Sequence, residues 1–350
     1  MESCWDLIHW LGQDPATSVL FCLDDPADLV RFAAVSHSWE QFAIENGFLK
    51  KLCLRLCPDV SIFSYATEVS SSKKIAEVGS SNYEWECQKK DHRIYSYFSY
   101  CLASPAAKSD CIDEPIGASS TDNPDEGIEN TLEPRDRVRT GPSYWSSKGE
   151  KDPGVPETLT YRLRSKLCVI DEIRVQPFEA FFQHGYPIYS AKTVQFRMGY
   201  SKLSQETRID TMHNAANSQK SADDNYVWTY TSPQYQMDQE NVLQSFKLPR
   251  PVICIGGILQ IELLGRVQKQ EMAGAYYFCV CHVQVIGHTL SPVFDADTTG
   301  NPVLKYFPDA RPCAASRSAL VEEAGESMWC SFVRRIMQLV LRCLCRRWFR

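Results

Sequence analysis

The stretch that decides the N-terminal fold is residues 11–39, LGQDPATSVLFCLDDPADLVRFAAVSHSW. Asp14 followed by Pro15 places a capping residue before a proline, which predicts that a helix begins here. Further along, Asp25 and Pro26 repeat the pattern. The acidic residues around them also suit the positive end of a second helix dipole. The stretch therefore predicts at least two short helices joined by a tight turn.

Apolar residues recur at helical spacing within and just beyond this stretch. They predict one buried stripe on each helix: Val19, Leu20 and Leu23, then Leu29, Phe32 and Ala33, then Trp39, Phe42 and Ala43. Ser36 or Ser38 can cap the third helix. A core made of three short helices is marginal on its own. We therefore expect this unit to pack against a partner protein or a neighbouring domain.

The whole chain is larger than one such unit. It has 350 residues, a net charge of −6 and 15 cysteines. The length indicates two or three structural units, and the negative charge gives no general attraction to nucleic acid. The first residues carry no basic segment followed by an apolar core, so we expect no secretory signal. Scattered cysteines favour a reducing compartment, and we expect the protein in the cytoplasm, the nucleus or both.

The order of residues from Leu11 to Trp39 resembles the F-box. The matching positions are Leu11-Gly12-Gln13-Asp14, Val19-Leu20-x-x-Leu23, Asp25-Pro26-x-Asp28-Leu29 and Val35-x-x-x-Trp39. The family opens with Leu-Pro-x-Glu/Asp, and this chain has glycine where that proline stands. The resemblance implies a module that docks the Skp-type adaptor of an SCF ubiquitin ligase and, through it, a cullin.

The resemblance also implies roles for individual residues. Val35 and Trp39 would hold the helices together, whereas a second set would contact the adaptor: Leu11, Val19, Leu20, Leu23, Pro26 and Leu29. Periodicity alone supports a plainer interpretation, in which these apolar positions form only the core of a three-helix unit.

A connector follows the F-box. Residues 58–82 are rich in Ser, Ala and Lys, which indicates a turn and a weak helix. Residues 84–102 predict a longer helix, because Ile94, Phe98, Cys101 and Leu102 lie on one stripe. We expect this helix to pack the F-box against the next domain.

The central part of the chain predicts many short strands. They are rich in Val, Ile, Tyr and Phe, are separated by turn residues, and span 159–163, 168–175, 193–198, 225–231, 241–247, 253–265 and 276–286. Many strands with little helix indicate an antiparallel β-sandwich or jelly roll. Gly256-Gly257 falls inside one predicted strand, where it would mark a bulge or close packing.

Short motifs in this part resemble a discoidin or galactose-binding-like domain. They are the small-residue segment 117–122, then 128–132, the Trp-Ser-Ser turn at 145–147, and 159–163. The resemblance covers about residues 109–290. The segment 175–199, with QPFEAFFQ at 176–183, further resembles a plant-type group of F-box proteins in which such a domain follows the F-box.

Domains of this type bind ligands at the loops of one end, so the resemblance implies that the target is held there. The candidate loop residues are Asn130, Arg135, Arg137, Phe181, Phe182, His184 and Tyr186. Two interpretations of Phe181 and Phe182 stay open: an apolar tip offered to a partner, or closure of the sandwich end. Trp145 is more typical of a core anchor than of a ligand platform. The polar insert 201–224 predicts a long loop.

The sequence carries no recognisable motif for catalysis or metal binding. Cys279-x-Cys281-His282 has no second ligand pair at zinc-site spacing, and in a strand His282 would face away from both cysteines. No phosphate-binding glycine loop or nucleophile elbow occurs. We therefore expect no catalytic residue, metal or cofactor.

The C-terminal residues predict one further helix. Residues 328–350 contain six arginines and no acid, and Arg335, Arg342 and Arg346 share a face opposite an apolar one. Such a basic amphipathic helix packs on a protein or lies on an anionic membrane, or its charge serves nuclear import or nucleic-acid contact. Residues 291–327 predict a flexible linker before it.

Together these patterns predict a multidomain α + β protein. Its units are an F-box helical domain (1–58), a helical connector (59–108), a β-sandwich (109–290), a linker (291–327) and the basic helix (328–350). The leading hypothesis is a non-catalytic subunit that recruits a target to an SCF-type ligase. The alternative is a glycan- or lipid-binding module with a membrane-surface tail and no ligase role.

Overall fold

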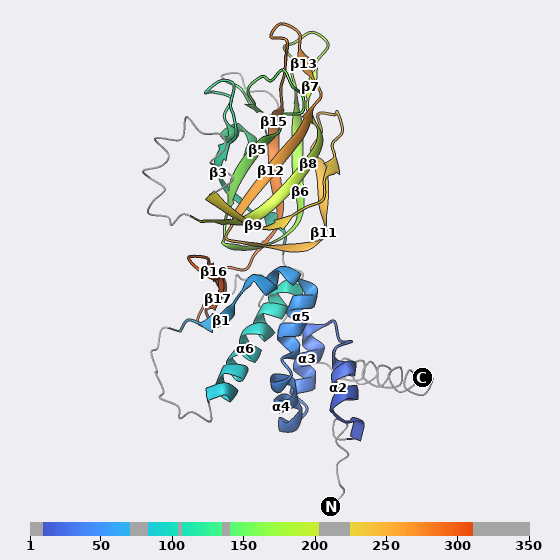
Figure 1. Cartoon of the computed structure of the whole chain (residues 1–350), viewed down its shortest axis with the longest axis vertical. Helices are drawn as coiled ribbons and strands as arrows, with labels where there is room; N and C mark the ends of the chain where they lie inside the picture. The colour runs from blue at the N-terminus through green and yellow to red at the C-terminus, as the bar shows by residue number, and fades with distance from the viewer. Residues whose placement is uncertain (1–9, 71–82, 104–106, 135–140, 203–224, 311–350) are drawn as a thin grey trace, which may run out of the picture.

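The computed structural model describes residues 10–70, 83–103, 107–134, 141–202 and 225–310. Helices gather at one end of the molecule and the β-sandwich forms the other (Figure 1). The helical elements are α2 (Gln13–Leu20), α3 (Pro26–Ala33), α4 (His37–Glu45), α5 (Phe48–Leu56), the 3₁₀ helix η1 (Pro58–Ile62) and α6 (Tyr83–Ala103). The helix predicted over 84–102 is thus confirmed as α6.

Two of the predicted helix caps are confirmed. The Asp25 carboxylate accepts a hydrogen bond from the Ala27 backbone N–H at 2.8 Å, and the Ser36 hydroxyl accepts one from Trp39 N–H at 3.2 Å. Each satisfies an amide that the first helical turn leaves unpaired. The start of α2 differs from the prediction, because its N-cap is Gly12 and Asp14 lies within the first turn.

The sandwich is built from two antiparallel six-stranded sheets. One has the order β10-β8-β12-β5-β3 with β9 beside β8, and the other β11-β6-β15-β2 with β4 beside β15 and β7 beside β6. The strands are β2 (Ser109–Asp110), β3 (Ile112–Ala118), β4 (Trp145–Ser146), β5 (Glu157–Leu163), β6 (Leu167–Glu179), β7 (Ile188–Tyr189), β8 (Ala191–Ser201), β9 (Tyr226–Thr231), β10 (Tyr235–Gln236), β11 (Gln244–Ile255), β12 (Ile258–Arg266) and β15 (Cys279–Thr289). A short 3₁₀ helix, η2 (Ile128–Thr131), lies between β3 and β4. The predicted antiparallel sandwich is confirmed.

One sheet of the sandwich is covered on both faces near the helices. On β6, Cys168 and Ile170 pack into the sandwich core, whereas Leu167 and Val169 pack with the helical residues. Strand β11 repeats this alternation, because successive side chains of a strand point to opposite faces. The helical end and the sandwich therefore share one continuous core.

An ion pair crosses the same boundary. The Arg250 guanidinium of β11 donates to the two Asp59 carboxylate oxygens of η1, at 2.7 and 3.0 Å. The hydrogen bond to Asp59 raises the pKa of Arg250 above its ordinary value. Because this contact is bidentate, it fixes the relative orientation of the Arg250 and Asp59 side chains as well as their distance. It therefore orients η1 against β11.

The expectation of a flexible linker is wrong for its first part. Residues 294–297 form β16 (Phe294–Asp297) and residues 303–306 form β17 (Val303–Tyr306). Strand β17 pairs in parallel with β1 (Tyr65–Glu68), which lies where a weak helix was predicted. Phe294, Ala296, Leu304 and Tyr306 are buried against the helical core, which explains why this segment is ordered.

A second correction concerns the strand predicted over 253–265. Gly256 and Gly257 end β11 and begin the turn into β12, which lies in the other sheet. Their φ angles of +94° and +70° are left-handed, a region that glycine adopts without strain. Close packing was expected there and is present, since a Cβ on Gly256 would lie 2.1 Å from Tyr200 Cβ.

Two predicted features lie outside the described residues. They are most of the insert 201–224 and the basic helix 328–350. In the part of the chain that is described, no helix is long and apolar enough to span a bilayer. A two-stranded ribbon of β13 (Lys269–Gln270) and β14 (Ala275–Tyr276) completes the fold at the far end of the sandwich.

Candidate functional site

The residues expected to contact an adaptor lie mostly inside the helical core. Val19, Leu20, Leu23 and Leu29 are only 2–3% exposed, Pro26 is buried, and Leu11 is half-buried. Side chains this deeply packed offer little surface to another protein. In the free chain Val19, Leu20, Leu23 and Leu29 pack together in the helical core, as their periodicity indicates, and adaptor contact through this set stays a prediction.

A different set of apolar residues faces outward from the same helices. Trp10 is 57% exposed, Phe21 38%, and Val30 and Val35 45% each. Val35 was expected to hold the helices together and does not. Trp39 does, with its ring 4.7 Å from that of Phe32. We call Trp10, Phe21, Val30 and Val35 the outer apolar set.

The missing proline of the F-box pattern has a structural explanation. Gly12 has φ of +76°, a left-handed angle, whereas a proline ring holds φ near about −65°. The chain thus enters α2 through a backbone conformation that proline cannot adopt. No neighbouring atom lies within 4 Å of where a Cβ on Gly12 would sit, so only the backbone angle restricts this position.

The far end of the sandwich holds two adjoining pockets, of about 140 and 290 Å³. They share Glu126, Tyr144 and Phe182 in their walls. The first is also lined by Asp122, Asn123, Ser146, Phe178, Ala180, Gln183, Tyr189, Gln270, Tyr277 and Cys279. We call this region the distal pockets, because it lies at the opposite end from the helices.

Aromatic rings stack in the walls of the distal pockets. Tyr144 lies on Phe178 with 3.8 Å between ring centroids, and Phe178 contacts Phe181 edge-on at 6.1 Å. Phe182 and Tyr186 extend from this cluster and are 59% and 61% exposed. Phe182 and Tyr186 thus form an outward tip, whereas Phe181 is 36% exposed and packs on Phe178 at the sandwich end.

The loop that carries this tip is held in shape by its backbone. Ala180 N–H donates to the Pro187 carbonyl at 2.9 Å, and Gln183 N–H donates to the Ala180 carbonyl at the same distance. Gly185 supplies a left-handed φ of +80°. His184 lies at the exposed tip. The candidate loop residues at 181–186 are therefore presented together on one hydrogen-bonded turn.

Two carboxylates, Asp122 and Glu126, give the distal pockets negative charge. Tyr144 donates its phenol hydrogen to Glu126 Oε1 at 2.9 Å. Burial, together with the negative charge of Glu126, raises the pKa of Tyr144 above its ordinary range. The tyrosine therefore stays a neutral donor at physiological pH. Within the described ranges neither carboxylate has an ion-pair partner.

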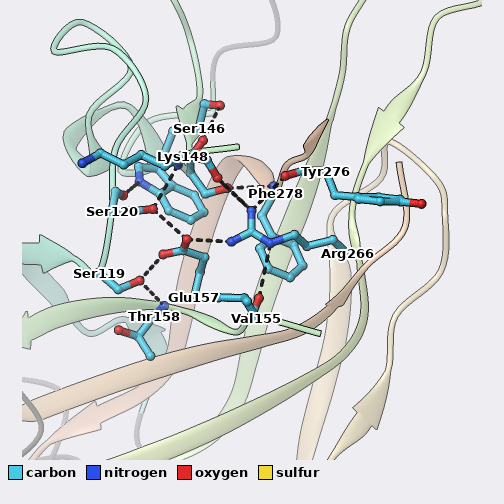
Figure 2. Close-up of polar contacts among 12 residues, drawn as sticks. Ser119, Ser120, Ser146, Lys148, Val155, Glu157, Thr158, Arg266, Tyr276 and Phe278 are labelled. Atoms are coloured by element: carbon cyan, nitrogen blue, oxygen red, sulfur yellow. Dashed lines mark hydrogen bonds and ion pairs between the residues drawn. The ribbon is translucent and has the colours of Figure 1, made fainter. Parts of the chain in front are cut away.

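A buried polar network beneath these loops is centred on Arg266, as Figure 2 shows. Its guanidinium donates to Glu157 Oε1 at 2.7 Å and to Ser147 Oγ at 2.8 Å. It also donates to three backbone carbonyls, those of Lys148 at 2.9 Å, Tyr276 at 3.1 Å and Val155 at 3.3 Å. One side chain thereby joins β12 to three other segments, two of which lead into the distal pockets.

Serine hydroxyls complete this network on the carboxylate side. Ser119 and Ser120 both donate to Glu157, the latter at 2.7 Å. Trp145 is fully buried and donates its indole N–H to the Ser120 carbonyl at 3.0 Å, so the expected core anchor is confirmed. The small-residue segment and the Trp-Ser-Ser turn are thus joined through one buried ion pair.

Other candidate loop residues are placed differently. The Asn130 side chain donates to the backbone carbonyls of Asp125 and Tyr144, at 2.8 and 3.0 Å. It thus links the two segments of the chain that contain these residues and stabilises their conformation. Arg135 and Arg137 lie outside the described residues. Asp122, Glu126 and Tyr144 were missed by sequence reasoning, because their segment is acidic, polar and similar to a linker.

The Cys-x-Cys-His segment is structural. Cys279 and Cys281 are buried in one small cluster, and burial raises the pKa of the Cys279 thiol to about 12. His282 faces the other way and bonds the Thr131 carbonyl through Nδ1 at 2.9 Å. Among the residues described, no group of three potential ligands could hold a metal ion.

Comparison with known proteins places this chain. No family model matches it. It is similar to the family 32 carbohydrate-binding module of Streptococcus pneumoniae EndoD, at 10% identity and a TM-score of 0.33, over 51% of this chain and 98% of that one. The family 32 module of Clostridium perfringens NanJ, solved with galactose, matches at 9% and 0.32, over 49% and 98%.

A curated relative matches along most of the chain. It is an F-box protein of Arabidopsis thaliana, 45% identical over 311 residues, which cover 86% of this chain and 82% of the relative. This chain belongs to the F-box protein family.

Proposed function

We propose that this protein is a substrate-recruiting subunit of an SCF-type ubiquitin ligase. In this proposal its helices bind a Skp-type adaptor, and through it a cullin, while the distal pockets bind the target. The observation that carries the proposal is an F-box relative at 45% identity, together with the outer apolar set on the helices that match the F-box. The protein itself performs no chemistry, and it acts by raising the concentration of target lysines near a charged ubiquitin carrier.

The outer apolar set supports the adaptor half of the proposal. Trp10 and Phe21 add exposed aromatic rings, a side-chain type that is enriched at protein interfaces. Val30 and Val35 lie on α3 and directly after it, on the surface that the helical core leaves uncovered. Because they are exposed in the free chain, we expect adaptor contact through them as well.

Binding of the purified chain to a Skp-type adaptor, measured by calorimetry, tests this half. Val30→Asp with Val35→Asp should weaken binding at least tenfold, because two charges would enter an apolar interface, and each buried charge costs more than about 1.4 kcal/mol. Val242→Asp with Val267→Asp is the matched control, since those valines are exposed on the sandwich. Equal affinity of all three proteins would contradict the proposal.

The distal pockets support the target half. They combine exposed aromatic rings, two carboxylates and a braced backbone at the end opposite the adaptor helices. A target held there would not compete with the adaptor for surface. Proximity labelling under proteasome inhibition should identify proteins that accumulate, and Phe182→Ala with Tyr186→Ala should remove them. Tyr65→Ala with Tyr83→Ala, also exposed, is the control.

One observation favours a second candidate, a glycan-binding module. Aromatic faces beside carboxylates are groups that can stack on a sugar ring and accept its hydroxyl hydrogens. Screening the chain against immobilised glycans distinguishes the two. Glycan binding without adaptor binding would favour the second candidate, whereas binding of both would make a glycan part of the target. Membrane contact by residues 328–350 is tested separately by liposome flotation.

A further inference from the structure

A third pocket, of about 390 Å³, lies at the end of the sandwich that faces the helices. Four turns or strand ends meet around it: the start of β3, the β5–β6 turn, the end of β8 and the β11–β12 turn. The β16–β17 turn of the small sheet closes one side with Thr298 and Thr299. We call this region the junction pocket. It lies at the other end of the sandwich from the distal pockets.

Positive charge dominates the junction pocket. Its lining contains four cations, Arg162, Arg164, Lys166 and Lys202, and a single acid, Asp113. Hydroxyl groups of serine, threonine and tyrosine fill much of the remaining wall. The chain as a whole carries a charge of −6, so this concentration of cations runs against the average. Four cations against one acid give the lining a net charge of +3, which favours an anionic ligand.

The nearby acids are engaged elsewhere or exposed to water. Glu114 pairs with Arg162 at 3.1 Å and is more than half exposed. Asp297 accepts from Thr299 and from the Lys305 ammonium group, the latter at 2.7 Å. In the described part of the chain, no carboxylate pairs with Arg164 or Lys166. Two cations at the pocket therefore have charge available for a ligand.

Backbone hydrogen bonds hold the chain positions that carry these cations. Lys166 accepts a hydrogen bond at its carbonyl from Gly256 N–H at 2.7 Å, and Arg164 N–H donates to the Cys111 carbonyl at 2.9 Å. The Arg164 side chain is oriented as well, because its Nε donates to the Ile112 carbonyl at 3.1 Å. That bond leaves the two terminal nitrogens of the guanidinium to bind an anion.

From this arrangement we propose that the junction pocket binds a phosphate-bearing ligand. A phosphoryl dianion presents several acceptor oxygens, which suit a guanidinium, ammonium groups and hydroxyls converging from different turns. The volume of about 390 Å³ lies within the range of small-molecule sites, so it holds a phosphoryl group together with the residue or sugar that carries it. A carboxylate ligand would use fewer of these donors.

Such a ligand would join two parts of the fold. Arg164 and Lys166 belong to the sandwich, whereas Thr298 and Thr299 belong to the small sheet whose β17 pairs with β1. Strand β1 follows the F-box helices in the chain. A bound phosphate would therefore stiffen the connection between the helices and the sandwich. This inference does not depend on the role proposed for the distal pockets.

Calorimetry on the full chain, at constant ionic strength, tests the proposal with pyrophosphate, sulfate and acetate. Pyrophosphate should bind most tightly. Arg164→Gln with Lys166→Gln should weaken it by roughly a hundredfold, about tenfold for each charge-assisted hydrogen bond lost. Lys151→Gln with Lys269→Gln removes the same charge from exposed positions at the distal end and should change affinity less than about threefold.

Two further probes distinguish the source of the phosphate. A short peptide with one phosphoserine stands for a protein ligand, and a hexose phosphate stands for a free metabolite. Tighter binding of either supports the proposal and names the source. The absence of binding by every phosphate probe would overturn it, as would equal loss in the control variant. Lys166→Gln alone serves if circular dichroism shows that the double variant is unfolded, because the hydrogen bond by which Lys166 holds the turn, to Gly256 N–H, uses its backbone carbonyl.

Discussion

Replacing Glu157 with glutamine tests whether the buried ion pair organises the far end of the sandwich. The Arg266 and Glu157 side chains are 0% and 4% exposed, and they lie 2.7 Å apart. Glutamine keeps the volume and one acceptor but removes the negative charge. Arginine cannot release its proton, so the positive charge would stay buried without a counter-ion. Breaking a buried pair on one side costs about 3–5 kcal/mol.

The structure places the expected cost near the lower end of that range. Arg266 keeps its hydrogen bonds to Ser147 and to three backbone carbonyls, which partly solvate the charge. We therefore expect a loss of about 3 kcal/mol in the free energy of unfolding. With an m-value of about 3 kcal/mol/M, the urea midpoint falls by about 1 M. Intrinsic fluorescence should report this unfolding, since Trp145 lies beside the network.

A second glutamate gives a matched control. Glu262 pairs with Arg197 at 3.1 Å between β12 and β8, but their side chains are 14% and 23% exposed. Because water can reach both groups, Glu262→Gln should cost no more than about 1 kcal/mol. Equal midpoint shifts for the two variants would refute the argument from burial. So would a shift below about 0.3 M for Glu157→Gln, since that corresponds to less than about 1 kcal/mol.

Three further outcomes are expected. Gly12→Ala should lower stability by about 1–2 kcal/mol in urea unfolding, because a Cβ opposes the left-handed φ, and Gly12→Pro should lower it more. Asp59→Asn should cost about 1–3 kcal/mol, since it breaks the two-pronged contact with Arg250, and limited proteolysis should then separate helices from sandwich. Burial lowers the pKa of His92 and of His288 below the usual 6.5, so the unfolded chain takes up these protons first as pH falls. Stability should therefore decrease as pH falls below about 6.5, a decrease that His288→Gln should reduce in urea titrations between pH 5 and 7.5.

Much of the fold could be predicted from local patterns. Caps such as Asp25 and Ser36 act within three residues, and alternating strands such as β5 carry their own signal. The small sheet could not be predicted this way. Strand β1 has only four residues, and its partner β17 lies more than 230 positions later in the chain. Local periodicity cannot indicate a pairing between strands so far apart in the sequence. The sequence of residues 291–310 therefore resembled that of a linker.

The candidate site shows a different limit. An apolar stripe on a helix looks the same whether it faces the helix's own core or a partner, so periodicity alone could not tell which apolar residues of α2 and α3 are buried, as Leu20 and Leu29 are, and which are exposed. Exposed residues such as Val30 become visible only after the core is assembled. Similarly, Glu126 and Tyr144 are 18 positions apart in the sequence and form a hydrogen bond only in the folded chain. A short sequence motif could not have predicted that contact.

The shared core bears on how a receptor of this kind would deliver a target. Leu167, Val169, Ile253 and Ile255 of the sandwich lie in the same cluster as the F-box helices, and Asp59–Arg250 fixes their orientation. Domains joined by a linker explore many orientations, whereas a continuous apolar core permits few. A target bound at the distal pockets would thus be held at a nearly constant distance from the adaptor. The junction pocket lies at this boundary, where a ligand could alter that geometry without touching either binding surface.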